Sequence, residues 1–261
     1  MNVANKTIII TGATSGIGYE TARIAIENGA NVLIHSSPHS EEKAKEICKK
    51  LGKQSAYFAF DLKSQDNIAS IIESAVSAFG RVDALVNNAG MFPRNNILNF
   101  TNNDYEDIMN VNIKSPMFLN QAISQYFIDN KIAGSIVNVG SINAYCGQDD
   151  IFVYSCSKGA LMTMTRNMAD FLGKHCIRVN QINVGWTHTE QEHQTQLREG
   201  RDENWASNIP SAFAPRGTIL APEEVAKHIL FWVSDDSTPV SGSVYEVEQY
   251  PIIGRNKINA S

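Results

Sequence analysis

A tyrosine and a lysine four residues apart, Tyr154 and Lys158, are the side chains in this sequence best suited to chemistry. No proline follows Tyr154, and the run leads into a long apolar-periodic segment, so we predict a helix there. Positions i and i+4 lie on the same helix face, which places the ammonium group beside the phenol. A nearby cation favours the charged form of a phenol, so we expect Lys158 to lower the pKa of Tyr154 from about 10. The pair could then act as a general acid and base near neutral pH.

A third candidate, Ser141, closes the apolar run 135–140, which predicts a buried strand. A hydroxyl at that strand end could reach the oxygen atom that Tyr154 protonates. Taken alone, a tyrosine four residues before a lysine would more often be a helix-edge phenol beside a solvated ammonium group. The rest of the chain decides between these two interpretations.

Composition limits the classes of protein to consider. The chain has 261 residues, 43% of them hydrophobic and 19% charged, which is typical of a soluble globular protein with a sizeable core. A formal net charge of -5 without a long basic run argues against nucleic acid or an anionic membrane as partner. The first apolar run has only three residues, too short for a signal peptide or a membrane span.

The sequence has four cysteines, Cys48, Cys146, Cys156 and Cys176. They show no C-x-x-C spacing, and no histidine cluster lies beside them in the sequence. We therefore expect reduced thiols in a cytoplasmic protein, with neither a disulfide framework nor a zinc site. No repeat or linker marks a second domain, so we predict a single domain over residues 1–261.

Predicted strands and helices alternate along the chain. We expect strands at 7–11, 31–35, 55–60, 82–86, 135–139 and 177–182, and helices at 19–28, 41–51, 66–79, 104–128 and 153–173. This alternation indicates βαβ units, hence an α/β fold with a doubly wound parallel sheet (a Rossmann fold) in three layers. Right-handed crossovers then leave a ligand crevice at the carboxyl ends of the strands.

A glycine-rich turn, Thr11 to Gly18, follows the first predicted strand and opens a helix. Gly12 permits a tight turn, while Gly16 and Gly18 allow phosphate and helix to approach the backbone closely. Free N–H groups at the helix start favour a pyrophosphate. This context predicts a dinucleotide site in preference to a loop that is merely rich in glycine.

Taken together, these motifs resemble the short-chain dehydrogenase/reductase family. The glycine pattern at 11–18, Asn-Asn-Ala-Gly at 87–90, Asn112, Ser141 and the Tyr154–Lys158 pair occur in the family's order and near its spacings. The resemblance spans roughly residues 6–247. It implies an NAD(P)-dependent oxidoreductase that interconverts a secondary alcohol and a ketone.

Several alternatives stay open beside that interpretation. The substrate could be another small ketone such as a 3-oxoacyl group, or the chain could be a catalytically silent, cofactor-binding regulatory protein. The intact Ser141, Tyr154 and Lys158 favour an enzyme. Enoyl reductases of this fold have more residues between the tyrosine and the lysine than this sequence has.

The resemblance implies a role for each matched residue. Tyr154 exchanges a proton with the substrate, Ser141 holds the substrate oxygen, and Lys158 binds the nicotinamide ribose. Asn112 orients a water molecule near Lys158, and Asp61 binds the adenine amino group. The residues implied to contact the dinucleotide are Gly12, Thr14, Ser15, Gly16, Ile17, Gly18, Ser36, Ser37, Asp61, Leu62, Asn88, Ala89, Gly90, Tyr154, Lys158, Gly185, Thr187 and Thr189.

The sequence departs from the family pattern at two places that bear on the cofactor. Val184 precedes Gly185 where the family has proline, which leaves that turn less rigid. The second strand ends in His35-Ser36-Ser37, with neither a carboxylate to select NAD nor an arginine to bind a phosphate. We favour NADP over NAD, with the Ser36 and Ser37 hydroxyls as donors to the 2′-phosphate. His35 is expected to be an ordinary strand-end residue, and His39 a solvated loop residue.

The segment 187–217 is strongly polar where such enzymes cover their substrate. This lid predicts a hydroxylated substrate, namely a sugar, a polyol or a sugar acid, in preference to a steroid or acyl chain. The predicted substrate contacts are Arg94, Ser141, Asn143, Tyr145, Tyr154, Trp186, His188 and Glu190. Arg94 and Arg255 are candidate clamps for a carboxylate, or surface ion pairs of little energetic weight. No metal site is predicted from His188, Glu190 and His193.

Two further expectations concern the ends and surfaces of the molecule. The segment 248–261 is predicted to form an extended C-terminal tail. In the family, the two helices expected at 104–128 and 153–173 pack on partner subunits, and the second carries more apolar surface than one sheet face needs. We predict a homotetramer, with a dimer as the next choice.

Overall fold

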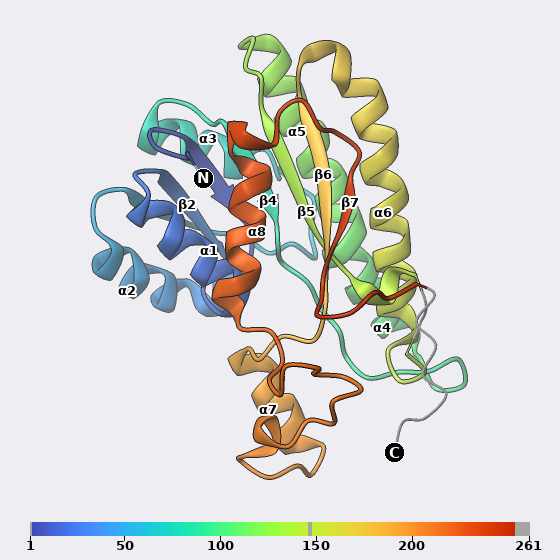
Figure 1. Ribbon diagram of the computed structural model, residues 1–261. Coiled ribbons are helices and arrows are strands. Elements are labelled where there is room, and N and C mark those ends of the chain that lie inside the picture. Colours follow the sequence, from blue (N-terminus) through green and yellow to red (C-terminus); the bar gives the residue numbers. More distant parts are fainter. Residues whose placement is uncertain (1, 146–147, 254–261) are drawn as a thin grey trace.

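The computed structural model describes residues 2–145 and 148–253, and their centre is a parallel sheet of seven strands (Figure 1). The order is β3-β2-β1-β4-β5-β6-β7, and every neighbouring pair is parallel. The strands are β1 (Thr7–Ile10), β2 (Asn31–Ser36), β3 (Ser55–Ala59), β4 (Ala84–Asn87), β5 (Ser135–Ser141), β6 (Arg178–Val184) and β7 (Val244–Val247). The chain runs outward from β1 to β3 and then returns to β4, so the strand order reverses between β1 and β4. Ligands of open α/β sheets bind at such a switch point.

Helices cover both faces of the sheet in three layers (Figure 1). They are α1 (Gly16–Glu27), α2 (Glu41–Leu51), α3 (Ser70–Phe79), α4 (Asn102–Met109), α5 (Ser115–Asp129), α6 (Phe152–Leu172), α7 (Glu190–Arg198) and α8 (Pro222–Val233). Single turns of 3-10 helix lie at Pro38–Ser40, Ile142–Ala144, Gly173–His175, Trp205–Ser207 and Asp235–Ser237.

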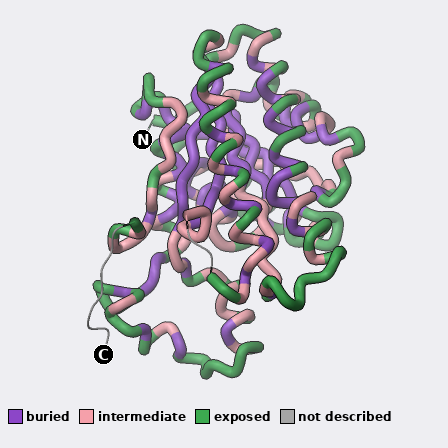
Figure 2. Tube along the Cα trace, turned by 90° about the vertical axis from the view of Figure 1, so that its right-hand side faces the viewer, coloured by how far each residue is buried: buried purple, intermediate pink, exposed green. Residues whose placement is uncertain are grey.

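The core divides into two halves because successive strand residues point to opposite faces. Ile8 and Ile10 of β1 pack in the cluster that includes α1 and α8, whereas Ile9 packs in the one that includes α3 and α5. All three side chains are fully buried. Figure 2 shows this buried band running through the centre of the molecule, with exposed backbone around it. The predicted doubly wound parallel sheet is confirmed.

The main difference from the predicted elements lies in the long helix expected at 104–128. The structure forms α4 and α5 there, joined by a π-helical turn at Asn110–Lys114. Several boundaries also differ. The largest shifts are at α3, which begins at Ser70 and not at residue 66, and at α1, which begins at Gly16 and not at residue 19. Thr101 begins α4 with a capping box, accepting from the Asp104 N–H while Asp104 accepts from the Thr101 N–H.

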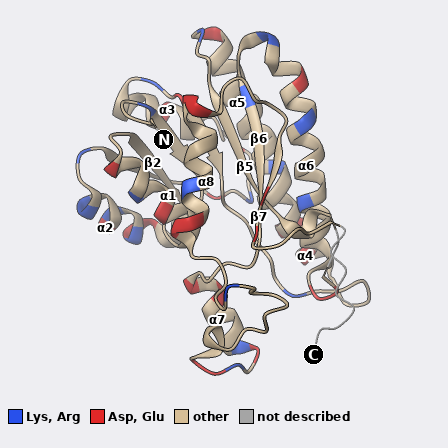
Figure 3. Ribbon diagram, viewed as in Figure 1, with Lys and Arg blue, Asp and Glu red and all other residues tan. Residues whose placement is uncertain are grey.

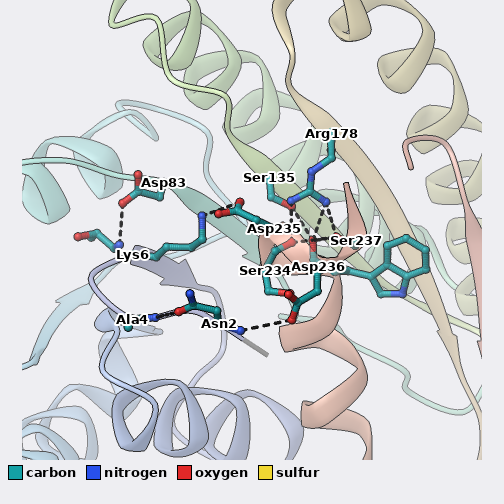
Figure 4. A network of polar contacts seen from close by, with 12 residues as sticks. Asn2, Ala4, Lys6, Asp83, Ser135, Arg178, Ser234, Asp235, Asp236 and Ser237 are labelled. Carbon is teal, nitrogen blue, oxygen red and sulfur yellow. Dashed lines mark hydrogen bonds and ion pairs between the residues drawn. The ribbon is translucent and has the colours of Figure 1, made fainter. Parts of the chain in front are cut away.

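The C-terminal end of α8 is fixed to the sheet by a buried arginine, Arg178 at the start of β6 (Figure 4). Its guanidinium donates to the Trp232 carbonyl at 3.0 Å and to the Ser234 carbonyl at 3.0 Å. Ser135, on the neighbouring strand β5, donates to the same Trp232 carbonyl at 2.9 Å. A cation at a helix C-terminus is stabilised by the helix dipole, so this network joins α8 to β5 and β6.

Charged residues lie mainly in the helices and loops and are sparse on the strands (Figure 3). Both signs also occur on α7 and in the loop after it. Within the described ranges, we find no helix that combines the length and the apolar character needed to cross a bilayer.

Candidate active site

One large cleft, with a volume of 1310 Å³, opens at the carboxyl ends of the strands. Each central strand delivers at least one lining residue at or just beyond its end: Gly12, Ser37, Asp61, Asn88, Ser141 and Gly185. In Figure 1, α7 and the loop after it lie beyond this same edge of the sheet. The cleft therefore occupies the place predicted for the ligand crevice.

The glycine-rich turn has a conformation that only glycine accommodates readily. Gly12 and Gly16 have φ angles of +63° and +53°. A Cβ atom on Gly12 would lie 3.0 Å from the Ala89 Cα, and one on Gly18 would lie 2.5 Å from the Gly12 carbonyl oxygen. Ser15 begins α1 without a side-chain capping bond, so the N–H groups of the first turn are left for an anionic ligand.

His35 supports this turn, which the sequence did not predict. The residue is buried, its Nδ1 accepts a hydrogen bond from the Gly12 N–H at 3.2 Å, and its Nε2 lies 3.0 Å from the Phe60 carbonyl oxygen. Burial lowers the pKa of His35 to about 4, so the ring is neutral with its proton on Nε2. The end of β2 thereby holds the first glycine of the phosphate-binding turn.

The two serines after His35 have different environments. Ser37 lines the cleft, as do His39, Ser40 and Lys63 around it. Ser36 does not line it, and its buried Oγ has no partner among the described residues. The strand alternation that turns Ser37 toward the cleft turns Ser36 into the protein. The predicted phosphate contact therefore remains a prediction for Ser37 and is not supported for Ser36.

The residues after β4 close the other side of the turn. Asn88 donates through its side chain to the Thr11 carbonyl at 2.9 Å and to the Gly12 carbonyl at 3.2 Å. The remaining residues predicted to contact a dinucleotide also line the cleft, apart from Gly18, which lies beneath the turn: Thr14, Ser15, Gly16, Ile17, Asp61, Leu62, Ala89, Gly90, Gly185, Thr187 and Thr189.

Ser141, Tyr154 and Lys158 meet at the floor of the cleft. The Tyr154 hydroxyl hydrogen-bonds the Ser141 hydroxyl, which also accepts from the Asn143 N–H at 3.2 Å. The buried Lys158 ammonium donates to the Val139 carbonyl at 2.8 Å and lies 5.5 Å from the centroid of the Tyr154 ring. The fold thus brings together the three groups that the sequence pattern singled out, from the end of β5 and the first turns of α6.

The predicted effect of Lys158 on Tyr154 is wrong for the chain alone. Burial raises the pKa of Tyr154, and the hydrogen bond from Ser141 opposes that increase only in part. Burial likewise lowers the pKa of Lys158, to about 8. Helical spacing correctly placed the two groups side by side, but burial is the largest influence on the pKa of each.

Asn112 occupies the π-helical turn between α4 and α5. Its side chain accepts from the Met91 N–H at 2.8 Å and donates to the Met91 carbonyl at 2.9 Å and to Ser157 Oγ at 3.0 Å. A Cβ atom on Gly90 would lie 3.6 Å from both Asn112 Oδ1 and Lys158 Nζ. Asn112 thus lies behind Gly90, near the lysine, without lining the cleft itself, and its role in orienting water stays a prediction.

The predicted substrate contacts divide into two groups. Arg94, Asn143 and Trp186 line the cleft, as do Ser141 and Tyr154. Tyr145, His188 and Glu190 do not, so their prediction is not supported. The Tyr145 hydroxyl bonds to Asn183 and Glu246, the His188 ring packs edge-on against Trp205, and Glu190 accepts from Gln194 in the first turns of α7.

Arg94 has acidic partners within the protein. Its Nε donates to the Glu199 carboxylate and lies 3.5 Å from Asp150 Oδ2. The other predicted clamp, Arg255, lies outside the described residues, as does most of the predicted tail and also Cys146. In the described part of the chain, no group of three or more His, Cys, Asp or Glu residues could hold a metal ion.

The wall formed by α7 supplies residues that the sequence did not single out. Glu192, Gln196 and Glu199 all line the cleft, and their i, i+4, i+7 spacing places them on one helix face. Glu192 Oε1 accepts from Trp186 Nε1 at 2.9 Å and from Gln196 Nε2 at 2.8 Å. Testing the polar segment for helical periodicity from residue 190 onward would have found this face.

Comparison with known proteins gives the same picture over nearly the whole length. A family model described as "Enoyl-(Acyl carrier protein) reductase" matches residues 12–249. The chain is 31% identical to 2-dehydro-3-deoxy-D-gluconate 5-dehydrogenase of Escherichia coli, with 95% of each chain covered. It is 30% identical to L-rhamnose 1-dehydrogenase (NADP(+)) of Thermoplasma acidophilum, covering 93% of this chain and 94% of the relative. It is 33% identical to a 3-oxoacyl-[acyl-carrier-protein] reductase of Thermotoga maritima, covering 95% of this chain and 98% of that relative.

Solved structures are similar over the same extent. A protein described as a "short chain dehydrogenase/reductase family protein" superposes with a TM-score of 0.80 at 30% identity, covering 95% of this chain and 97% of that one. A blue fluorescent protein from a metagenomic library, solved in complex with NADPH, gives a TM-score of 0.83 at 26% identity, covering 95% of this chain and 98% of its own. With the Ser141, Tyr154 and Lys158 constellation in the cleft, these similarities assign the chain to the short-chain dehydrogenase/reductase family of oxidoreductases.

Proposed function

We propose that this protein is an NAD(P)-dependent dehydrogenase/reductase that interconverts a secondary alcohol and a ketone on a polyhydroxylated substrate. The observation that carries this function is the hydrogen-bonded Ser141–Tyr154 pair above the buried Lys158 ammonium, in the same cleft as the glycine-rich turn.

The cleft fits a dinucleotide on its own geometry. Gly12 and Gly18 allow the turn and the start of α1 to pack tightly on the sheet, and the first-turn N–H groups of α1 are left for a pyrophosphate. Lys158 Nζ has one partner, Val139, among the described residues, so two of its three protons are left for a ribose hydroxyl and a water molecule. When bound, a nicotinamide cofactor supplies or accepts the hydride.

We favour NADP over NAD. The end of β2 presents Ser37, His39 and Ser40 to the cleft, and no carboxylate that would repel a 2′-phosphate. Lys63 lines the same end, although it also pairs with Asp107 at 2.6 Å. The name of the Thermoplasma relative includes NADP(+). Comparing the KM values for NADP and NAD on one substrate tests this preference.

The chain's own residues supply the proton chemistry. In the reducing direction, Tyr154 donates its hydroxyl proton to the substrate oxygen, and Ser141 holds that oxygen through a hydrogen bond. The Lys158 ammonium lies close enough to favour the resulting phenolate, which offsets the unfavourable burial of that charge. The reverse steps serve oxidation of an alcohol.

The α7 side of the cleft carries the acceptor groups of Glu192, Gln196 and Glu199, which supports a substrate rich in hydroxyl groups. Glu192 and Gln196 are linked to each other there, and Gln196 Oε1 is buried without a partner among the described residues. An unpaired buried acceptor is costly, so a ligand donor near it would be stabilising. The similarity to a sugar-acid and a sugar dehydrogenase agrees with this substrate class.

A panel assay would test the function. Purified protein is given polyols, aldoses, sugar acids and a 3-oxoacyl thioester, and the absorbance of reduced nicotinamide is followed with each dinucleotide. We expect the highest kcat/KM on a sugar, polyol or sugar acid. Higher kcat/KM on the thioester would instead favour the second candidate, a 3-oxoacyl reductase, suggested by the Thermotoga relative.

We further propose that the protein is a cytoplasmic homotetramer and that segment 187–217 acts as a lid. Exposed apolar side chains on α5 and α6 support association: Met117 is 50% exposed, Phe118 43% and Phe171 61%. Large exposed apolar residues on neighbouring helices are typical of subunit interfaces. The polar face of α7 lines the cleft, which supports the proposed role of segment 187–217 as a lid.

A further inference from the structure

We propose that Arg201 binds an anionic group of the substrate, so that the natural substrate is a hydroxylated carboxylic acid and not a neutral sugar. This inference rests on the proposed dehydrogenase function and narrows it. It follows from the cations that line the cleft, because an anionic ligand needs one that is not already paired.

The other three lysine and arginine residues that line the cleft are less suited to an anionic substrate group. Arg94 is held by Glu199 and Asp150, so a substrate carboxylate would have to displace both of these carboxylates. Lys158 is buried beneath the reacting groups and bound to Val139. The third, Lys63, pairs with Asp107 and lies toward the end of the cleft formed by Asp61 and Leu62.

Arg201 differs from these cations because its guanidinium has no hydrogen bond or ion pair within residues 2–145 and 148–253. It lines the cleft, in the loop that follows α7. It nevertheless has aromatic contacts, since the guanidinium carbon lies 5.6 Å from the ring centroid of Trp186 and 5.9 Å from that of Trp205. Its backbone N–H also donates to the Gln196 carbonyl at 3.0 Å.

The aromatic support under Arg201 is itself rigid. Trp186 and Trp205 stack with their centroids 5.5 Å apart and their planes at 23°. Trp186 Nε1 donates to Glu192, and Trp205 Nε1 donates to His193 Nδ1 at 3.0 Å. A guanidinium stacked on indole rings keeps its N–H edge free for a carboxylate, which it can bind bidentately.

The charges near Tyr154 determine which part of the substrate carries the anion. Glu192 is close enough to raise the pKa of Tyr154, so an anionic substrate group at the reacting carbon would be repelled. A carboxylate at Arg201 avoids this repulsion if the reacting carbon and the acid group lie at different ends of the molecule. The hydroxyl groups between them would face Glu192 and Gln196.

The test compares a keto-aldonate with the matching ketose, which carries a hydroxymethyl group in place of the carboxylate. In Arg201→Gln we expect KM for the keto-aldonate to rise about 10- to 100-fold, as the loss of a charge-assisted hydrogen bond implies. KM for the ketose and for the dinucleotide should change less than about twofold. Arg198→Gln is the control, because Arg198 bonds within α7 to Gln194 and Thr195 and does not line the cleft.

The outcomes separate this inference from the proposed function. If wild type uses the ketose as well as the keto-aldonate and Arg201→Gln changes neither KM, Arg201 has no such role while the dehydrogenase function stands. If the dinucleotide KM is the value that rises, Arg201 binds cofactor phosphate and the inference is wrong.

If wild type reduces neither compound, a binding measurement still decides. Trp186 and Trp205 lie under Arg201, so gluconate should quench tryptophan fluorescence of the dinucleotide-loaded wild type, and sorbitol should not. This response should be lost in Arg201→Gln and kept in Arg198→Gln. No response to gluconate in the wild type would overturn the inference.

Discussion

At the scale of single residues, the hydroxyl of Tyr154 is the group on which the proposed chemistry depends. Tyr154→Phe keeps the ring and its packing but removes the transferable proton. We expect kcat to fall about 10²- to 10⁴-fold, the usual contribution of a general acid or base. Dinucleotide binding, measured by calorimetry, should persist. Tyr145→Phe is the matched control, since Tyr145 does not line the cleft, and near-normal turnover by Tyr154→Phe would refute the assignment.

Lys158 makes the stability of the protein depend on pH. Its pKa is about 8 in the folded chain against an ordinary 10.5, so between these values the unfolded state binds more protons than the folded state. Stability therefore rises with pH across this window, and below it the buried ammonium costs up to about 3 kcal/mol.

Denaturant unfolding of wild type and Lys158→Met at pH 7 and at pH 10 would measure this linkage. As the pH rises from about 8 toward 10.5, the free energy of unfolding should increase more for wild type than for the variant. Both proteins should carry Tyr154→Phe as background, because Tyr154 titrates in the opposite sense and lies beside Lys158. A difference that is constant with pH would show that Lys158 has an ordinary pKa.

At the scale of elements, the contact between α8 and the sheet depends on Arg178. Arg178→Met removes charge-assisted hydrogen bonds to the Trp232 and Ser234 carbonyls, and we expect a loss of about 2 kcal/mol in the free energy of unfolding. The loss is limited because Ser135 and Ser237 still donate to the Trp232 carbonyl. Lys227→Met, which breaks an ion pair with Glu223 that is exposed on both sides, should cost less than about 1 kcal/mol. Equal losses for the two variants would contradict this ranking.

The sequence predicts elements well where a local pattern is sufficient. The alternation of buried strands and amphipathic helices defines the sheet, and the glycine turn and the Tyr154–Lys158 spacing define the floor of the cleft. The π-helical turn at 110–114 has no such local pattern, because Asn112 gains its partners Met91 and Ser157 only after the chain folds. The buried role of His35 was missed for the same reason. The α7 face, in contrast, follows from the local i, i+4, i+7 spacing of Glu192, Gln196 and Glu199.

At the scale of the whole molecule, the prediction concerns how many copies of the chain assemble. If α5 and α6 form the subunit interface, a charge placed on the exposed apolar side chain of Phe118 would be buried without a partner there. We expect the wild type to be a tetramer by light scattering at micromolar concentration and Phe118→Glu to form smaller species. Phe213→Glu is the control, since Phe213 is 54% exposed but lies at the cleft. A monomeric wild type would contradict the proposal.

The hydrogen bond from the Gly12 N–H to His35 has a consequence for protein engineering. His35 and Ser37 both line the cleft, but only His35 bonds to the turn, so cofactor preference and turn integrity can be changed at different positions. A designer who wants an NAD-selective enzyme can place an acid at Ser37 and leave the imidazole intact. We expect Ser37→Asp to raise KM for NADP about tenfold or more, with little change in the melting temperature. His35→Asp should impair use of both dinucleotides, since it would bury a carboxylate where the turn needs a neutral acceptor.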